Sequence, residues 1–280
     1  MEPALYIVAT PIGNLGDISR RAMEVLQDAN TVAAEDTRRT GQLLSSLGIS
    51  RPMLAYHEHS ADSVAQRLVR AIAAGESVAL VSDAGTPTIS DPGYRLVRAV
   101  QEEGLAVVPV PGACALIAAL SASGLPSDRF TFGGFLPAKR DARRQHLKSI
   151  AAADATQIFY EAPHRIQEAL EDLVECLGAD REAALARELT KRFETLRRGA
   201  LGELRDWVAE DSNQARGELV VLVGPAPRDE GVLDEPALMN LLAELSELVP
   251  ARQAAKLLAR HSGHSSRDLY NALLRRQAQP

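Results

Sequence analysis

The chain is poor in cysteine and has no long apolar run. Its 280 residues include two cysteines, Cys114 and Cys176, and neither lies in a Cys-x-x-Cys pair or in a Cys/His cluster with zinc-ligand spacing. No stretch reaches the roughly 18 consecutive apolar residues of a membrane-spanning helix. The residues Met1-Glu2-Pro3 do not open a secretory signal. We therefore expect a cytoplasmic protein without a disulfide framework, a metal or a membrane partner.

Excess positive charge is also missing. The chain carries 31 basic and 37 acidic residues, a formal charge of −6, which argues against a polycation that coats nucleic acid by bulk attraction. The charge is unevenly distributed, however. From Ala251 to Pro280 there are six basic residues and one acid, a net charge of +5 that leaves −11 on the remaining chain. This segregation is typical of a phosphate-binding appendage or of a solvated helical face, and charge alone does not decide between them.

Short aliphatic runs alternate with longer amphipathic segments along most of the chain. This alternation predicts an α/β fold whose parallel sheets are built through crossover helices. The predicted strands are Leu5 to Ala9, Val78 to Val81, Ala106 to Val110, Gln157 to Tyr160, Ala183 to Ala186 and Leu219 to Val223. Two apolar helix faces are predicted, one through Val64, Leu68 and Ile72 and one through Ile166, Leu170, Leu173 and Leu177.

Two breaks in the pattern predict the domain organisation. Residues 121–137 hold a glycine pair, two prolines and three phenylalanines, and we interpret them as a connection between an α/β half at 1–120 and a second half at 121–224. We expect the three phenylalanines, Phe130, Phe132 and Phe135, to be core residues. Residues 225–235 are polar and contain prolines, which predicts a linker to a helical module at 236–280.

That module is predicted to contain three short helices. A leucine stripe through Leu238, Leu241, Leu245 and Leu248 marks the first helix, and Pro250 ends it. The sequence Ser265-Ser266-Arg267-Asp268 is typical of a capping box at the start of the last helix.

Three strand-to-helix turns, at residues 10–17, 82–93 and 111–115, concentrate the glycine and polar residues. Open α/β sheets bind ligands at the carboxyl ends of their strands. The first turn matches neither a Gly-x-Gly-x-x-Gly motif nor a P-loop, which disfavours a dinucleotide or nucleoside triphosphate. A strand-end carboxylate, Asp83, beside Gly85 suits a cationic small ligand. Asp91 before Pro92 fits the N-cap of a helix.

Several longer motifs carry a family resemblance. They are ATPIGNLGDIS (residues 9–19), AEDTRRT (34–40), SDAGTPTISDPG (82–93), PGACALIAALSASGL (111–125), FYEAPHRI (159–166) and RELTKRFE (187–194). Together they resemble the tetrapyrrole methylase superfamily, S-adenosylmethionine (SAM) methyltransferases with two α/β halves and the cofactor between them. Within it, the chain is most similar to the branch that methylates the ribose 2′-hydroxyl of a cytidine in the decoding region of 16S ribosomal RNA. The resemblance spans residues 4–224, and the basic tail resembles that branch's helix-turn-helix-like module.

The resemblance implies SAM as cofactor, 16S rRNA or the small ribosomal subunit as substrate, a homodimer, and a set of site residues. The implied cofactor residues are Pro11, Gly13, Leu15, Asp83, Gly85, Thr86, Ile89, Ser90, Cys114, Ala115, Phe159, Tyr160, Ala162, Gly217 and Glu218. The first turn reads Pro11-Ile12-Gly13-Asn14 where the superfamily has a Gly-Pro-Gly-Asp type pattern, a departure that fits the RNA-modifying branch.

A ribose hydroxyl needs a base to remove its proton. The candidate bases are Glu35, Asp36, His164 and Glu188, with His57 and Glu161 in the same motifs; Asp36 also fits a helix N-cap. Candidate phosphate contacts are Arg38, Arg39, Lys139, Arg140, Arg143, Arg144, Arg187, Lys191, Arg192, Arg252, Lys256, Arg260 and Arg267; for those beside acids, ion pairing is the alternative.

Two other functions stay open at this point. A corrinoid, porphyrin-precursor or diphthamide methylase would share the two-half architecture, but the basic tail argues against it. A SAM-sensing binding protein would bind the cofactor without turnover.

Overall fold

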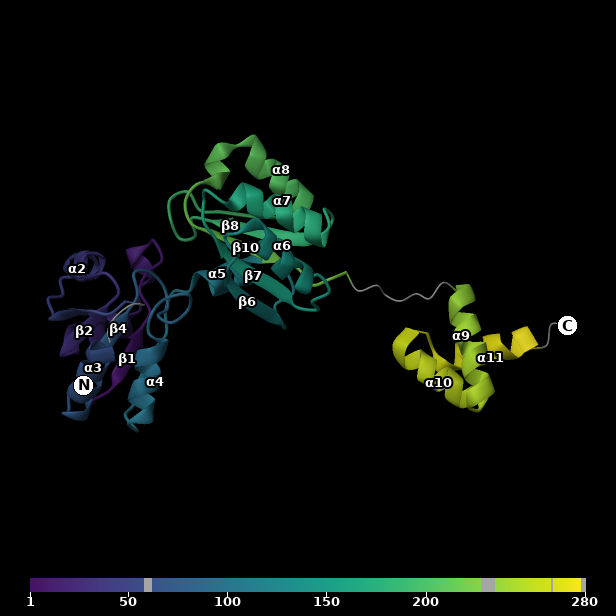
Figure 1. Cartoon of the computed structure of the whole chain (residues 1–280), viewed down its shortest axis with the longest axis horizontal. Helices are drawn as coiled ribbons and strands as arrows, with labels where there is room; N and C mark the ends of the chain where they lie inside the picture. The colour runs from purple at the N-terminus through teal and green to yellow at the C-terminus, as the bar shows by residue number, and fades with distance from the viewer. Residues whose placement is uncertain (58–61, 228–234, 263, 278–280) are drawn as a thin grey trace. The chain divides into compact units, whose positions relative to one another are not determined.

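The structure is a computed structural model that describes residues 1–57, 62–227, 235–262 and 264–277 (Figure 1). The chain divides into two compact units, Met1–Pro225, here called the body, and Ala226–Pro280, here called the tail module. Each unit is described by itself.

The first half of the body is a five-stranded parallel sheet in the order β3-β2-β4-β1-β5 (Figure 1). Its strands are β1 (Leu5–Val8), β2 (Thr31–Ala34), β3 (Met53–Ala55), β4 (Val78–Val81) and β5 (Val107–Val110). Its helices are α1 (Arg20–Asp28), α2 (Thr37–Ser46), α3 (Asp62–Ala73) and α4 (Tyr94–Glu102). Alternate strand residues enter two cores, one shared with α1 and α2 and the other with α3 and α4. Since both faces are covered, the strands consist almost entirely of apolar residues.

The turns that follow β1, β4 and β5 are held together by their backbones. Thr10 and Gly85 form an antiparallel bridge, with N–H to O distances of 2.8 Å from Thr10 to Gly85 and 3.1 Å in the reverse direction. A Cβ atom on Gly112 would lie 2.9 Å from that of Ala9, so only glycine allows the third turn to pass so close. Parallel strands end at the same sheet edge, and these contacts gather the three turns there.

The second half of the body is a mixed sheet in the order β6-β7-β10-β8-β9. The strands are β6 (Phe130–Phe135), β7 (Thr156–Glu161), β8 (Glu182–Arg187), β9 (Thr195–Ala200) and β10 (Leu219–Val223). β6 and β7 are parallel, whereas β10 is antiparallel to both of its neighbours and β9 is antiparallel to β8. The prediction of parallel sheets is therefore confirmed for the first half and wrong for the second. A short loop joins β8 to β9, and such a loop permits only antiparallel pairing.

Helices cover both faces of this second sheet. α6 (Arg140–Ser149), α7 (Ile166–Leu177) and α8 (Leu201–Glu210) share one core with it, and α5 (Ala115–Ser123) shares the other. α5 follows the last strand of the first sheet but packs on the second, so the boundary predicted at residue 121 falls inside this helix. α5 thereby ties the two halves of the body together.

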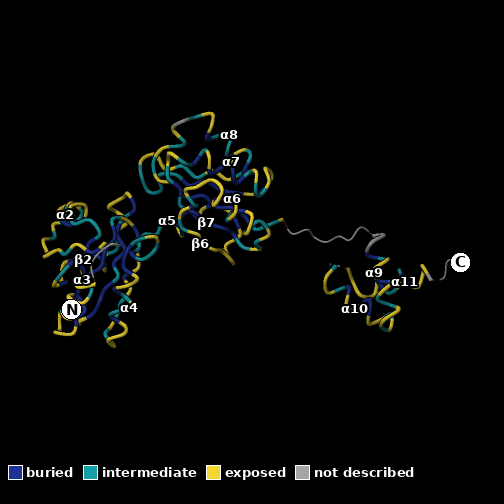
Figure 2. Tube along the Cα trace, viewed as in Figure 1, coloured by how far each residue is buried: buried dark blue, intermediate teal, exposed yellow. Residues whose placement is uncertain are grey.

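All six predicted strands are present, with ends that differ by at most one residue. Four strands were not predicted: β2, β3, β6 and β9. β6 lies in the segment interpreted as a connection, at the sheet edge where alternation is weak and the register shifts between Phe132 and Phe135. Phe130 and Phe135 are 43% and 55% exposed, so the expectation that they are core residues is wrong, while Phe132 packs on the α5 side. Figure 2 shows that buried residues are concentrated in the interior of each half of the body.

The tail module has the three predicted helices, α9 (Glu235–Leu248), α10 (Ala251–Ser262) and α11 (Ser266–Gln277). The buried face of α9 includes Leu238, Leu242 and the partly buried Leu245, so the predicted stripe is confirmed at Leu238 and Leu245. It is wrong at Leu241 and Leu248, which are 37% and 80% exposed. The predicted cap of α11 is confirmed, because the Asp268 amide donates to the Ser265 hydroxyl at 3.1 Å. In the described part of the chain, no helix is long and apolar enough to cross a membrane.

Candidate functional site

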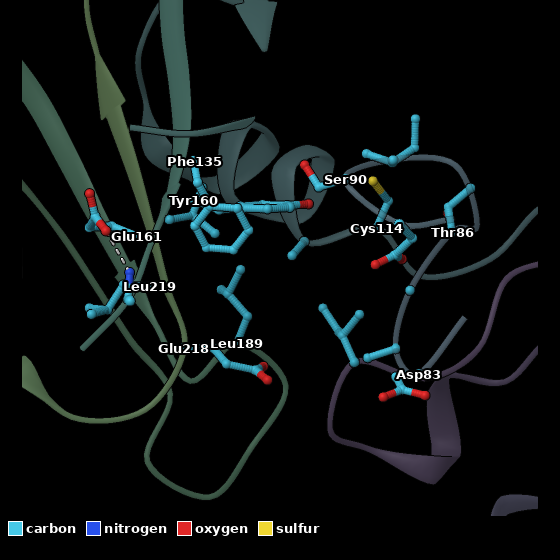
Figure 3. Close-up of a pocket in the computed structure, with 18 of the residues that line it drawn as sticks. Asp83, Thr86, Ser90, Cys114, Phe135, Tyr160, Glu161, Leu189, Glu218 and Leu219 are labelled. Atoms are coloured by element: carbon cyan, nitrogen blue, oxygen red, sulfur yellow. Dashed lines mark hydrogen bonds between the residues drawn. The ribbon is translucent and has the colours of Figure 1, made fainter. Parts of the chain in front are cut away.

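A pocket of about 400 Å³ lies in the body where the turns of the first sheet face the second sheet (Figure 3). Asp83, Thr86, Ser90 and Cys114 lie on one side of it and Tyr160 lies on the other. Its volume falls within the range of about 300 to 1,000 Å³ that is usual for small-molecule sites. The expected crevice between the halves is therefore present and open.

On the first side, Asp83 is held by contacts from two turns. Its carboxylate accepts a hydrogen bond from the Asp36 amide at 3.1 Å and pairs with Arg39 at 2.9 Å. Its own amide donates to the Glu35 carboxylate at 3.2 Å. The ends of β2 and β4 therefore fix this carboxylate at the pocket wall.

Backbone strain is concentrated in two loops beside the pocket. Among the described residues, four that are not glycine have a clearly positive φ: Thr88 (75°) and Ser90 (60°) in the loop after β4, and Glu188 (51°) and Thr190 (66°) in the loop after β8. Such conformations cost free energy for side chains other than glycine and persist where the surroundings impose them. One strained loop comes from each half of the body.

Asp91 is a pocket residue that the sequence analysis did not identify. The N-cap of α4 is Gly93, so the expectation that Asp91 caps this helix is wrong. Burial raises the pKa of Asp91 to about 6; the Ser82 hydroxyl opposes this, and the nearby Glu35 and Asp83 carboxylates add to it. The sequence Asp91-Pro92-Gly93 fits the start of a helix, so nothing in the sequence indicated that the Asp91 carboxyl lines a pocket.

On the second side, the Tyr160 hydroxyl accepts a hydrogen bond from the Leu116 amide at 3.2 Å, in the first turn of α5. Burial, with the nearby Cys114 and Asp91, raises the pKa of the Tyr160 phenol above its ordinary value. The Phe132 and Phe135 rings meet the Tyr160 ring edge to face, with centroids 4.9 and 5.8 Å away. An aromatic wall therefore faces the acidic turns.

A polar clasp joins the two halves beside the pocket. The Lys191 ammonium pairs with Glu188 at 2.8 Å and with Glu218 at 3.1 Å, and its aliphatic stem lies against Gly13 of the first half. Burial opposes ionisation of Glu188, but hydrogen bonds from Lys191 and the Glu218 amide outweigh it and lower the pKa of Glu188. The clasp places Leu189 in the pocket wall.

The structure brings ten of the fifteen predicted cofactor residues to the pocket wall: Asp83, Gly85, Thr86, Ile89, Ser90, Cys114, Ala115, Tyr160, Ala162 and Glu218. The other five do not line it: Pro11, Gly13, Leu15, Phe159 and Gly217. Phe159 is buried on the opposite face of β7, against His146, because neighbouring strand residues alternate between faces. Gly13 contacts the clasp, and Leu15 is 51% exposed.

The predicted bases have different environments. Glu35 lines the pocket. The Asp36 carboxylate caps α2 through the Arg38 amide and pairs with the Arg38 guanidinium, which lowers the pKa of Asp36. Glu188 is engaged in the clasp. His164 is exposed and lies outside the pocket lining.

The remaining two candidates, His57 and Glu161, also differ. His57 is exposed beside a second, smaller recess. Glu161 is buried; burial raises its pKa despite the Ala162 amide and Arg165.

Among the predicted phosphate contacts, those that are exposed are Arg38, Arg39, Lys139, Arg140, Arg192, Arg252, Lys256, Arg260 and Arg267. Others are held within the fold. Arg143 is completely buried and pairs with Asp172, and Arg144 pairs with the same carboxylate. Arg187 donates to the Phe193 carbonyl, and Lys191 belongs to the clasp. These four therefore have structural roles that compete with phosphate binding, and Arg143 is not available at the surface.

The comparisons with known proteins agree with this geometry. A family model described as tetrapyrrole (corrin/porphyrin) methylases matches residues 4–205. A uroporphyrin-III-C-methyltransferase from Thermus thermophilus superposes with a TM-score of 0.56 over 79% of this chain and 94% of its own, at 20% identity. A diphthine synthase superposes with a TM-score of 0.58 over 79% and 90%, at 16% identity. The fold is thus that of the tetrapyrrole methylases, and the chain belongs to this family.

Relatives of higher sequence identity identify the branch of the tetrapyrrole methylases to which the chain belongs. Proteins from Pseudomonas aeruginosa (54% identity over 98% of this chain and 97% of theirs), Vibrio cholerae (54% over 92% and 89%) and Escherichia coli O157:H7 (50% over 98% and 95%) are each named ribosomal RNA small subunit methyltransferase I. A model described as the RsmI C-terminal HTH domain matches residues 232–277. The chain belongs to this family of methyltransferases, which confirms the resemblance drawn from its motifs.

Proposed function

We propose that this chain is a SAM-dependent methyltransferase that modifies the ribose 2′-hydroxyl of a cytidine in 16S ribosomal RNA. The observation that carries the proposal is the acidic pocket between the two halves, in a chain about half identical to relatives named for ribosomal RNA methylation. The cytoplasmic location and the homodimer stay predictions; sedimentation of the purified protein checks the homodimer.

The pocket residues fit SAM in size and charge. Five carboxyl-bearing residues and a single arginine are among those lining it, so the wall favours a cation such as a sulfonium over a phosphate. Gly85, at φ 85°, brings backbone close to Ile12 and the Ala113 carbonyl. Since Ala84, Ala115 and Ala162 also have small side chains, the ligand contacts backbone over much of this wall.

The bound cofactor supplies a methyl group that its positively charged sulfur already activates for transfer. The protein's task is to orient the acceptor oxygen and to exclude water. The acidic turns hold the positive charge, and the Phe135, Tyr160 and Leu189 side chains provide the apolar part of the wall. The first side of the pocket is rigid because the Arg39 guanidinium and the Asp36 amide hold the Asp83 carboxylate in place.

RNA would reach this pocket through exposed cations. Arg38 is 88% exposed beside the pocket turns, and Arg252, Lys256 and Arg260 are exposed on α10. In the tail module these side chains surround a core of leucine and alanine, so the module can present charge without losing its packing. Phosphate contacts of this kind position RNA without reading its sequence.

Two measurements test the proposal. Calorimetry with SAM is expected to show one site, and Asp83→Ala is expected to weaken binding at least about tenfold, because a partly buried charge of the pocket wall is lost. Small subunits from cells that lack the modification, incubated with labelled SAM, are expected to carry the label on a ribose. Label on a base alone rejects the 2′-O assignment, and the absence of cofactor binding rejects the site.

The tail is tested by removing charge. Replacing Arg252, Lys256 and Arg260 by glutamine is expected to weaken subunit binding and to flatten its salt dependence, without changing SAM affinity. The matched control replaces Arg20, Arg51 and Arg67, exposed cations of the body, and should bind subunits as the unmodified protein does. Equal losses in both triple variants would contradict a role for the tail.

A further inference from the structure

The Asp91 carboxyl lies at a wall shared by two cavities. It lines the main pocket, and it also lines a second recess of about 80 Å³ formed by residues 91–95 with Tyr56 and His57. A water molecule occupies about 30 Å³ in the liquid, so the recess has room for the edge of a sugar but not for a whole nucleotide. A group bound there would contact Asp91, the same residue that lines the main pocket.

The rim of this recess has groups suited to a nucleotide. Tyr94, the first residue of α4, is 67% exposed although it is aromatic. Arg95 follows it and is exposed. Exposed aromatic rings stack unpaired bases in RNA-binding proteins, and arginines hold phosphates. The ring, the guanidinium and the carboxyl come from one short segment, residues 91–95, whose path is fixed by the strained Ser90 and by Gly93.

We propose that this recess receives the ribose of the acceptor nucleotide, with its base stacked on Tyr94, and that Asp91 accepts the proton of the 2′-hydroxyl. The proposal rests on the proposed function and adds the acceptor subsite and the base to it. The O–H bond of the ribose breaks and its proton moves to Asp91. The oxygen forms a bond to the methyl carbon, the carbon–sulfur bond breaks, and its electron pair stays on sulfur as a neutral thioether.

The charges around Asp91 suit this role. Glu35 and Asp83 face it from the ends of β2 and β4 and Tyr160 from β7, and the Ser82 hydroxyl lowers its pKa against the effect of burial. Arg39, in the main pocket, pairs with Asp83 at 2.9 Å, and His57 and Arg95 lie in the recess. Burial and the two acidic neighbours raise the pKa of Asp91 to about 6. When the pKa of a base lies slightly below the working pH, most copies of the base are deprotonated and still accept a proton readily.

Four other carboxyls near the pocket have partners of their own, and a fifth, Glu161, lines the main pocket but not the recess. The Asp36 carboxylate caps α2, and the Asp83 carboxylate holds Arg39. Glu188 is tied to Lys191 in the clasp. Glu35 accepts the Asp83 amide and lines the main pocket but not the recess. Asp91 is the carboxyl that both cavities share.

The first experiment compares Asp91→Asn with the unmodified enzyme on undermethylated small subunits. Since a positioned base contributes a factor of about 10² to 10⁴, kcat is expected to fall by that factor, while calorimetric SAM affinity falls by at most about tenfold, because one of five wall carboxyls is lost. The control Asp28→Asn changes an exposed carboxyl at the end of α1 and should match the unmodified enzyme in both measurements. Full activity of Asp91→Asn, or a loss of SAM affinity in parallel with kcat, overturns the assignment.

The second experiment tests the stacking surface. Tyr94→Ala is expected to raise KM for subunits about tenfold or more with SAM affinity unchanged, and Tyr94→Phe to restore KM because the ring is kept. An unchanged KM in Tyr94→Ala overturns the subsite.

The pH profile decides the assignment even where Asp91→Asn does not fold. The kcat of the unmodified enzyme should fall tenfold per pH unit below about pH 6, since only the carboxylate accepts the proton. A flat profile from pH 5 to 8 overturns the role of Asp91. If the unmodified enzyme places no methyl on ribose, the proposed function fails and this inference with it; if it does and Asp91→Asn is fully active, the inference alone fails.

Discussion

Two aspartates of the body, Asp172 and Asp91, show what neighbours do to a carboxyl removed from water. Asp172 on α7 is completely buried and accepts hydrogen bonds from Arg140, Arg143 and Arg144 at 3.1, 2.7 and 2.7 Å. Burial opposes its ionisation, but the arginines outweigh burial and lower the pKa of Asp172. Asp91 is partly buried, faces other carboxylates and has a raised pKa.

The different environments of the two carboxyls indicate different roles, one in the fold for Asp172 and one in the site for Asp91. In the Asp172 cluster, arginines of α6 compensate the buried carboxylate of α7 and thereby join the two helices. Asp91 lies beside two cavities, and the negative charge of its carboxylate is poorly compensated by its neighbours. Perturbed groups in a cleft are candidates for catalysis, whereas paired buried groups usually serve the fold.

The largest expected effect comes from breaking the compensated cluster. Asp172→Asn removes the closer and buried counter-charge of the Arg143 guanidinium and leaves only the exposed Glu168 at 3.5 Å, so the free energy of unfolding should fall by about 3 to 5 kcal/mol in denaturant titrations. The control Asp154→Asn removes an exposed partner of Arg129 and should cost less than about 1 kcal/mol. If both variants lost similar free energy of unfolding, the buried cluster would stabilise the protein no more than an exposed ion pair does.

A smaller effect is expected from the backbone that positions Asp91. Gly93 has φ 139°, and a Cβ there would lie 2.8 Å from Leu80 Cδ2 and 3.0 Å from Thr88 Cγ2. Gly93→Ala should therefore lower the free energy of unfolding by about 2 to 3 kcal/mol and reduce methylation. Gly104→Ala has a positive φ of 68° but open space, and should cost about 1 kcal/mol with activity retained. Equal costs would mean that the crowding around Gly93 is relieved by small shifts.

The smallest effect concerns the stability cost of Asp91 itself. Its folded pKa is raised, so the stability linked to its protonated form is present below the unfolded value near pH 4 and is lost as the pH rises through about 6. Asp91→Asn avoids that loss. Its free energy of unfolding should equal that of the unmodified protein near pH 4 and exceed it at pH 7.5 by roughly 1 kcal/mol, allowing for the partial exposure of the group. The stability difference between Asp91→Asn and the unmodified protein should therefore grow from pH 4 to pH 7.5. A difference that shrinks over this range would contradict the raised pKa of Asp91.

Much of this site was predictable because its residues follow strands. Buried strands such as Val78–Val81 are continuous apolar runs, and the polar residues directly after them, Asp83 and Thr86, line the pocket as expected. Three of the four missed strands, β3, β6 and β9, lie at sheet edges, and β6 is exposed and interrupted by glycines; the fourth, β2, is an inner strand of only four residues. The Phe159 side chain was misplaced relative to the pocket because the motif does not show which face of β7 each residue occupies.

The sequence by itself determined the α/β class, six of the strands, the family and the basic tail, because local apolar patterns and long motifs carry that information within a few residues. Only the tertiary structure decided that Arg143 is an internal counter-ion and that Asp91 joins two cavities. Burial and charge compensation depend on neighbours that are distant along the chain: Arg143 meets Asp172 29 residues away, and Asp91 meets Glu35 from another strand.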